Sequence, residues 1–104
     1  MEQFIYVLRP VRLEMLTEGP TATESEAVSA HVAYLEENAA AGTVLLAGRS
    51  QTADEDTFGI VILKAASLEA AAEFMANDPA IKGDAMSARL FPYSIAAVSP
   101  AILE

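Results

Sequence analysis

Hydrophobic positions along the chain follow two spacings, one typical of strands and one typical of helices. Three short apolar segments rich in β-branched and aromatic residues predict strands over residues 4–8, 43–47 and 58–63. The third is apolar on both faces, which is typical of a central strand covered on two sides. Residues 85–98 predict a fourth strand, or a bent pair of short ones. Pro92 within it favours a sheet edge or a bulge.

Two longer segments carry the three- and four-residue spacing of amphipathic helices. Thr23 and Glu26 have the spacing of a capping box, so a helix is expected from there to about residue 41, where Gly42 is a natural stop. The expected inward face of this helix consists of Val28, His31, Val32, Leu35 and Ala39.

A second helix is expected to begin after Ser67, whose hydroxyl can cap it. Asp78 should end this helix, because the residue before a proline avoids helical backbone angles. Its apolar stripe is expected to hold Leu68, Ala71, Ala72 and Met75. The remaining stretches are predicted to be a surface loop over 10–22, a hairpin-like loop over 51–57 and a turn over 80–84.

The predicted order of elements is β-α-β-β-α-β in one domain over residues 1–104. Right-handed crossovers place both helices on the same face of the sheet. The expected α+β fold is therefore a ferredoxin-like two-layer sandwich with an antiparallel four-stranded sheet. The first and third strands are apolar on both faces, so the face without helices is expected to pack on a second copy and form a dimeric α/β barrel.

Composition narrows the classes of partner. Acidic residues outnumber basic ones 15 to 6, and the net charge of −9 disfavours nucleic acid and an anionic membrane surface. No apolar run approaches the roughly 20 residues of a membrane span, and the first residues lack the pattern of a secretory signal. The absence of cysteine excludes disulfides and thiolate chemistry and fits a cytoplasmic location.

His31 is the only histidine, and it falls on the inward face of the first helix. Histidine exchanges protons near neutral pH, so a catalytic role is one interpretation; a buried histidine bonded to a carbonyl is the other. In this topology the end of the second helix adjoins the first helix, so Asp78 is expected to approach His31. A carboxylate there would orient the imidazole. The alternative is that Asp78 only terminates its helix.

Gly48, Arg49 and Ser50 follow the second strand and form a candidate substrate-binding turn. Glycine permits close approach of a ligand, and arginine binds carboxylates with two hydrogen bonds. Arg9 is a further candidate for an anionic substrate, as are Arg12 and Arg89; each of these arginines also suits a solvated surface position. One histidine and no cysteine make a zinc site improbable, and no cofactor-binding motif is present, so neither metal nor cofactor is expected.

Several segments in order along the chain resemble the YciI-like, or YCII-related, family. They are FIYVLRP, LTEGPT, HVAYLEENAAAGTVLLAGR, FGIVILKA, SLEAAAEFMANDPAI and LFPY. The resemblance implies a ferredoxin-like fold that pairs into a dimeric α/β barrel. It also implies that His31 and Asp78 correspond to the histidine and aspartate proposed as that family's active site. The chain departs from better-known members in having Ala-Gly-Arg where many have Ala-Gly-Pro, and in a longer loop before the histidine helix.

Three functions follow from these observations. The leading hypothesis is a cofactor-free lyase or isomerase, motivated by the positions of His31 and Asp78 and by the family resemblance. The resemblance implies a few relatives that act on small aromatic or lactone-like compounds, including a dehydrochlorinase of a chlorinated hydroxyquinol. A non-catalytic ligand-binding or assembly module is the second, favoured by the 53% hydrophobic content. A cofactor-independent oxygenase is the third, and no separate feature of the sequence favours it.

Overall fold

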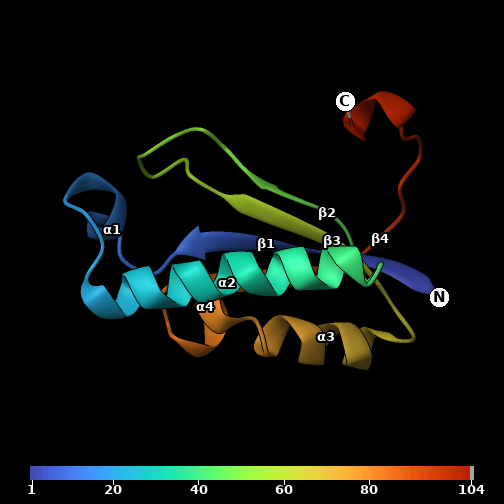
Figure 1. Cartoon of the computed structure of the whole chain (residues 1–104), viewed down its shortest axis with the longest axis horizontal. Coiled ribbons are helices and arrows are strands. Elements are labelled where there is room, and N and C mark those ends of the chain that lie inside the picture. Colours follow the sequence, from blue (N-terminus) through green and yellow to red (C-terminus); the bar gives the residue numbers. More distant parts are fainter. Residues whose placement is uncertain (104) are drawn as a thin grey trace.

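A computed structural model, which describes residues 1–103, shows four strands in one antiparallel sheet of order β2-β3-β1-β4. The strands are β1 (Glu2–Pro10), β2 (Val44–Arg49), β3 (Gly59–Ala65) and β4 (Met86–Tyr93). Helices α2 (Ala22–Ala40) and α3 (Leu68–Ala76) lie on one face of this sheet (Figure 1). The order and the two main helices confirm the ferredoxin-like α+β fold, with β3 central and β4 at an edge as the sequence predicts.

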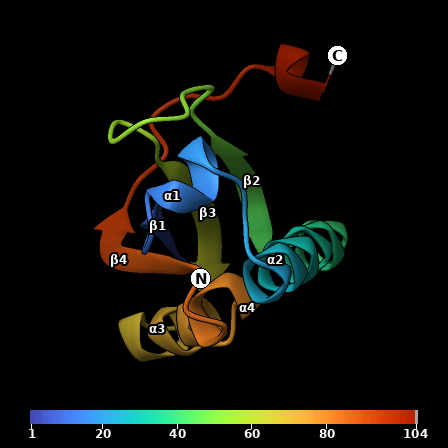
Figure 2. The same ribbon diagram turned by 90° about the vertical axis from the view of Figure 1, so that its left-hand side faces the viewer.

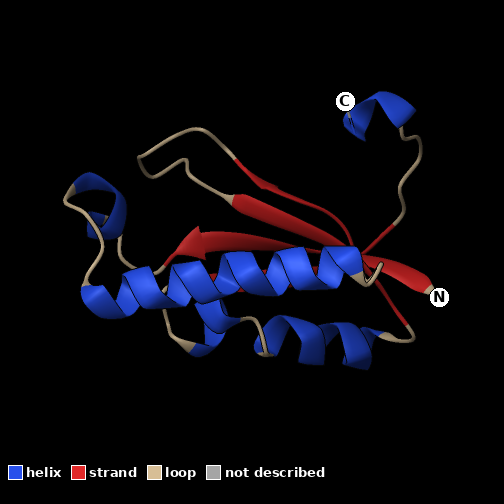
Figure 3. Ribbon diagram, viewed as in Figure 1, coloured by secondary structure: helices blue, strands red, loops and turns tan. Residues whose placement is uncertain are grey.

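Three short helical turns complete the described chain, as the colouring of Figure 3 makes plain. They are α1 (Glu14–Thr17), α4 (Pro79–Lys82) and the 3₁₀ turn η1 (Pro100–Leu103). The predictions of a plain loop over 10–22 and a turn over 80–84 were therefore wrong in part. A four-residue helix spans little more than one turn, too short to produce a readable hydrophobic period.

The core lies between the sheet and the helices. Alternate residues of β1, namely Phe4, Tyr6 and Leu8, point toward the helices and are at most 2% exposed. Opposite them, Leu63 and Val61 of β3 are fully buried. Burial of these side chains supplies the main driving force for folding, at roughly 25 cal/mol per Å² of apolar surface.

The first long helix begins two residues earlier than the sequence predicts. Its capping box joins Thr21 and Glu24: the Glu24 amide donates to Thr21 Oγ1 (3.1 Å), and the Thr21 amide donates to Glu24 Oε1 (2.9 Å). The prediction that Thr23 and Glu26 form the box was wrong, although both pairs have the same spacing. Arg12 decides between them, because it binds the Glu24 carboxylate and holds it at the helix start.

The inward face of α2 also differs from the prediction in part. Glu24, Ala27 and His31 form its buried row, whereas Val32 is 47% exposed. Ala39 is exposed as well. Both residues border an open cavity beside β2 instead of the packed core. Leu68 at the start of α3 was likewise expected on an inward apolar stripe, but its side chain is 51% exposed.

Asp78 does not end α3; it begins α4. Helix α3 closes at Ala76 with Asn77 as its C-cap, and the Asp78 side chain then caps α4 by accepting from the Ala80 amide at 3.0 Å. Pro79 occupies the first helical position, where its missing N–H costs nothing. Figure 1 shows α3 running antiparallel to α2, so this junction lies against the middle of α2.

In residues 1–103, α2, α3 and α4 all lie on one face of the sheet and leave the other face open, as Figure 2 shows nearly along the strands. Directly paired residues share a face, so register places Ile5, Ile62 and Phe91 side by side there, with Val7 and Ile60 next to them. We call these five residues the bare apolar patch. Phe91 is 39% exposed, so this face offers apolar surface to solvent.

The C-terminal residues 94–103 leave the sheet beyond β4 and end in η1, away from the helices (Figures 1 and 2). Apolar side chains in this segment are strongly exposed: Val98 at 70% and Leu103 at 92%. Among residues 1–103, no helix has both the length and the hydrophobicity needed to cross a bilayer.

Candidate functional site

A buried histidine–carboxylate pair lies where α4 meets α2. His31 Nδ1 is 2.7 Å from Asp78 Oδ1, although 47 positions separate the two residues in sequence. The Asp78 side chain is fully buried and that of His31 is 11% exposed. The structure thus brings together the two residues chosen from sequence as catalytic, through the α2–α4 contact.

The Asp78 carboxylate has three hydrogen-bonding partners. Besides His31, the Ala80 amide donates to Oδ1 at 3.0 Å and the Tyr6 hydroxyl donates to Oδ2 at 2.7 Å. Tyr6 comes from the middle of β1 and is fully buried. Burial raises the pKa of the Tyr6 hydroxyl, and the neighbouring Asp78 carboxylate raises it further, so Tyr6 stays protonated as a donor. A buried carboxylate needs such partners in place of water.

The free face of His31 opens into a cavity of about 740 Å³. The cavity runs between α2 and β2, and the segment around α1 closes one end with Met15 and Leu16. His31 Nε2 makes no hydrogen bond in residues 1–103, and no buried side-chain nitrogen or oxygen in that range lacks a partner. Nε2 therefore faces accessible space, with Nδ1 held by the carboxylate behind it.

Two of the predicted substrate-binding residues line this cavity and two do not. Gly48 and Arg49 lie on its β2 wall, opposite α2, and Arg49 is exposed. In the described part of the chain the Arg49 side chain makes no hydrogen bond or ion pair, which leaves its guanidinium available to a ligand.

The structure places Ser50 and Arg9 outside the cavity. Ser50 closes the β2–β3 hairpin: its amide donates to the Phe58 carbonyl at 2.8 Å and its hydroxyl accepts from the Phe58 amide at 3.0 Å. Arg9 lies on the bare side of the sheet, with its guanidinium carbon 6.0 Å from the Phe58 ring centre. Neither residue reaches the space beside His31 in this arrangement.

An ion pair fixes the wall formed by the α1 segment. Arg12 donates from Nε to Glu24 Oε2 at 2.8 Å and from Nη2 to Oε1 at 3.0 Å. These bonds, with that of the Thr21 amide, lower the pKa of Glu24 to about 2. The segment that carries Met15 and Leu16 is thereby tied to the first turn of α2.

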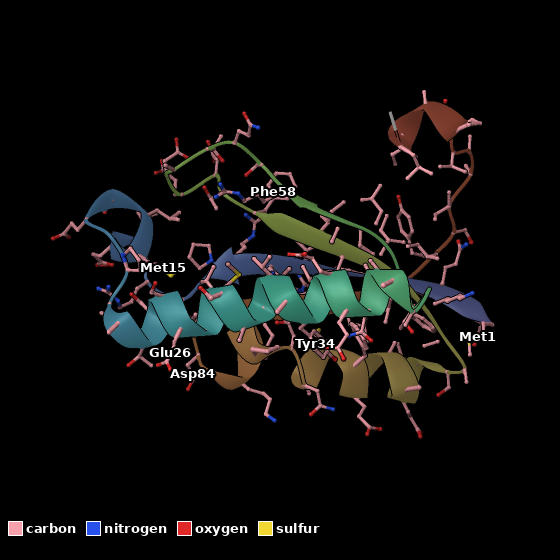
Figure 4. The ribbon with its side chains drawn as sticks, viewed as in Figure 1. Met1, Met15, Glu26, Tyr34, Phe58 and Asp84 are labelled. Carbon is pink, nitrogen blue, oxygen red and sulfur yellow. The ribbon has the colours of Figure 1, made fainter. Side chains whose placement is uncertain are left out.

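A second tyrosine, on α2, links the helix that carries His31 to α3. Tyr34, one turn after His31, reaches from α2 toward α3 (Figure 4), and its hydroxyl donates to the Phe74 carbonyl at 2.8 Å. Burial, with a smaller contribution from the Asp78 charge, raises the pKa of Tyr34 to about 12. Tyr34 thus closes the core beside the pair and remains neutral at physiological pH.

Three parts of the site were not foreseen from sequence: Tyr6, the Ala80 amide and Tyr34. The only available signal was Tyr6 itself, a residue with a polar tip in the middle of a strand whose other residues are apolar. Within residues 1–103, no group of three or more histidine, aspartate or glutamate side chains is arranged to hold a metal ion.

Comparison with known proteins gives matches of two kinds, one to solved structures and one to a family model. The structure is similar to that of 5-chloro-2-hydroxyhydroquinone dehydrochlorinase from Burkholderia phenoliruptrix, solved in complex with 2,5-dihydroxybenzoquinone. The TM-score is 0.62 at 20% sequence identity, over 88% of this chain and 93% of that one, and at this identity the likeness shows the fold. A search of curated proteins finds no match. The YCII-related domain family matches residues 10–92, so the chain belongs to that family.

Proposed function

We propose that this protein is a cofactor-free acid–base enzyme that moves a proton on a small anionic or aromatic substrate, as a lyase, isomerase or dehydrochlorinase does. One observation carries the proposal: His31 is held through Nδ1 by a buried carboxylate while Nε2 faces a cavity large enough for a one-ring compound. A general base needs this combination of fixed orientation and access to substrate.

The pair defines the direction of proton transfer. An ionised Asp78 can only accept hydrogen bonds, so the shared hydrogen lies on His31 Nδ1 and the lone pair of Nε2 faces the cavity. Nε2 removes a proton from a hydroxyl or carbon of the substrate, and the released electron pair forms a new C=O or C=C bond. In elimination a chloride then leaves with the electrons of its C–Cl bond. In isomerisation the imidazolium returns the proton to another carbon.

The lining of the cavity favours an anionic ring as substrate. Apolar side chains such as Leu35 and Phe58 surround the space, and Arg49 supplies a cation without a partner in residues 1–103. Such a site suits a phenolate or carboxylate attached to a flat hydrocarbon body. The similarity to the dehydrochlorinase supports a chlorinated polyhydroxybenzene as the first compound to test.

A second copy of the chain is the proposed protein partner. The bare apolar patch lies on the face of the sheet opposite α2 and α3 and joins residues of three neighbouring strands. Burial of this patch against another copy would remove apolar surface from water and complete a dimeric α/β barrel. The exposed apolar residues of segment 94–103 add to the surface available for such contact.

The test measures turnover of 5-chloro-2-hydroxyhydroquinone, by chloride release and quinone absorbance, and of catechol- and muconolactone-type compounds. We expect His31→Gln to lower kcat/KM by about 10²–10⁴-fold, the usual contribution of a general base. Asp78→Asn should lower it less. Glu26→Gln, a change at an exposed position of the same helix that does not line the cavity, serves as the matched control and should leave turnover within about twofold.

The outcomes separate catalysis from simple binding. Equal turnover by the wild type and His31→Gln, with both folded by circular dichroism, would refute the base role. Tight binding of these compounds by calorimetry without turnover in the wild type would instead identify a ligand-binding module. The largely apolar lining of the cavity makes that module the alternative function.

A further inference from the structure

Tyr6 stands behind the histidine–carboxylate pair without touching the cavity. Its hydroxyl donates to Asp78 Oδ2 at 2.7 Å, on the carboxylate oxygen that His31 does not use. Tyr6 is fully buried and is not among the residues that line the cavity. Any effect of this hydroxyl on a substrate must therefore pass through Asp78 and His31.

We propose that Tyr6 is a positioning residue that sets both the orientation and the basicity of His31 through Asp78. The inference deepens the proposed function and uses that same site. With Oδ2 bound to Tyr6 and Oδ1 bound to the Ala80 amide, the carboxylate has one fixed plane, and Nδ1 of His31 meets it at 2.7 Å. Rotation of the carboxylate would break one of these bonds in a region that water does not reach.

The same hydrogen bond reduces the negative charge of the Asp78 carboxylate that acts on His31. A hydroxyl that donates to a carboxylate withdraws part of its negative charge, which weakens the attraction between that carboxylate and an imidazolium. Removal of the hydroxyl leaves Oδ2 buried and unpaired, so the pair gains more from taking up a proton. The titration midpoint of the pair should rise whichever of the two groups holds that proton.

The charged and titratable groups around His31 lie on two sides of its ring. On the buried side they are Asp78, Tyr6 and Tyr34; on the cavity side they are Glu36 and Arg49. Within residues 1–103, Tyr6 and the Ala80 amide are the only groups that share the Asp78 carboxylate with His31. Tyr34 has the same side chain and is only partly buried, and its hydroxyl donates to a backbone carbonyl instead of to Asp78, so Tyr34→Phe provides the control.

The test follows the titration of His31 by NMR, which is unambiguous because the chain has a single histidine. We expect Tyr6→Phe to raise the midpoint by about one pH unit, and Tyr34→Phe to leave it within about 0.2 unit. Site-specific 3-fluorotyrosine at position 6, a stronger donor, should lower it. This second probe keeps the ring and the hydroxyl, so it serves if Tyr6→Phe does not fold.

An unchanged midpoint with both probes, or a shift equal to that of Tyr34→Phe, would overturn the proposal. The titration needs no substrate, so its result is independent of whether the protein is an enzyme. Where turnover is found, the pH profile of kcat/KM should move with the NMR midpoint while KM changes little, because the hydroxyl does not reach the cavity. A purely structural role would not move that profile.

Discussion

Gly83 lies directly against Ala27, and this contact sets how closely α4 approaches α2. A β carbon at position 83 would come within 2.9 Å of the Ala27 β carbon and 3.0 Å of the Pro79 carbonyl oxygen. Both atoms belong to rigid parts of the fold and cannot turn aside as the end of a long side chain can. The absence of a side chain at Gly83 therefore permits the helix contact that places Asp78 against His31.

Gly83→Ala should accordingly destabilise the fold by about 1–3 kcal/mol, the usual cost of forcing an extra methyl group into a packed site. Urea unfolding followed by circular dichroism measures the effect. Gly48→Ala is the matched control: a β carbon there meets no atom within 4 Å, and stability should change by less than about 0.5 kcal/mol.

A double variant tests the cause. If the clash with Ala27 is responsible, Ala27→Gly should restore part of the stability lost in Gly83→Ala, even though glycine in a helix costs about 1 kcal/mol by itself. If the stability lost in the double variant equals the sum of the losses in the two single variants, the contact with Ala27 is not the cause of the destabilisation.

The pH dependence of stability should reveal the Arg12–Glu24 ion pair. The pKa of the Glu24 carboxyl is about 2 in the folded state, below the ordinary value of 4.5. The ion pair therefore stabilises the fold fully above about pH 4.5. This contribution is lost as pH falls from there toward 2, where the carboxyl becomes protonated in the folded state. Glu24→Gln should thus destabilise at neutral pH, and its difference from the wild type should shrink over that window.

Urea midpoints measured at several pH values between 2 and 7 provide the check. Glu26→Gln is the control, because Glu26 is exposed on the same helix and has no ion pair in residues 1–103. A Glu24→Gln difference that stays constant from pH 7 to pH 2 would show that the ion pair does not contribute as proposed.

Sequence patterns predicted the topology because they are local and redundant. The alternation in β1, the continuous apolar run in β3 and the Ser67 cap each mark one element, and crossover handedness then leaves few arrangements. The approach of His31 and Asp78 followed from that topology alone. Thr21 and Thr23 show the limit: each has a glutamate three residues later, and only the distant Arg12 selects Glu24.

The unpredicted parts of the site depend on facts that no local pattern contains. β1 is apolar on both faces, so its sequence does not say whether Tyr6 or its neighbours point toward the helices. The open cavity beside β2 has the same origin: Val32 has helical spacing suitable for a core, yet it borders empty space and is 47% exposed. Such outcomes depend on how the elements pack together.

Association of two copies should depend on the bare apolar patch. Phe91→Asp places a charge within the bare apolar patch, beside Ile5, and desolvation of that charge opposes pairing. We expect the wild type to elute at twice the mass of one chain by size exclusion with light scattering, and Phe91→Asp at the mass of one chain. Leu68→Asp, on the exposed side of α3, should remain a dimer. A monomeric wild type would contradict the barrel proposal.

Arg49 should govern affinity for anionic substrates and leave the chemical step unchanged. Its guanidinium stands on the wall opposite α2, and loss of one charge-assisted hydrogen bond typically costs about 10- to 100-fold in binding. Arg49→Gln should therefore raise KM or Kd by that factor with kcat little changed, and the difference should narrow at high salt because ions screen exposed charges. Lys82→Gln removes an equal charge from an exposed position outside the cavity and should bind like the wild type. Equal losses in both variants would assign the effect to net charge instead of Arg49.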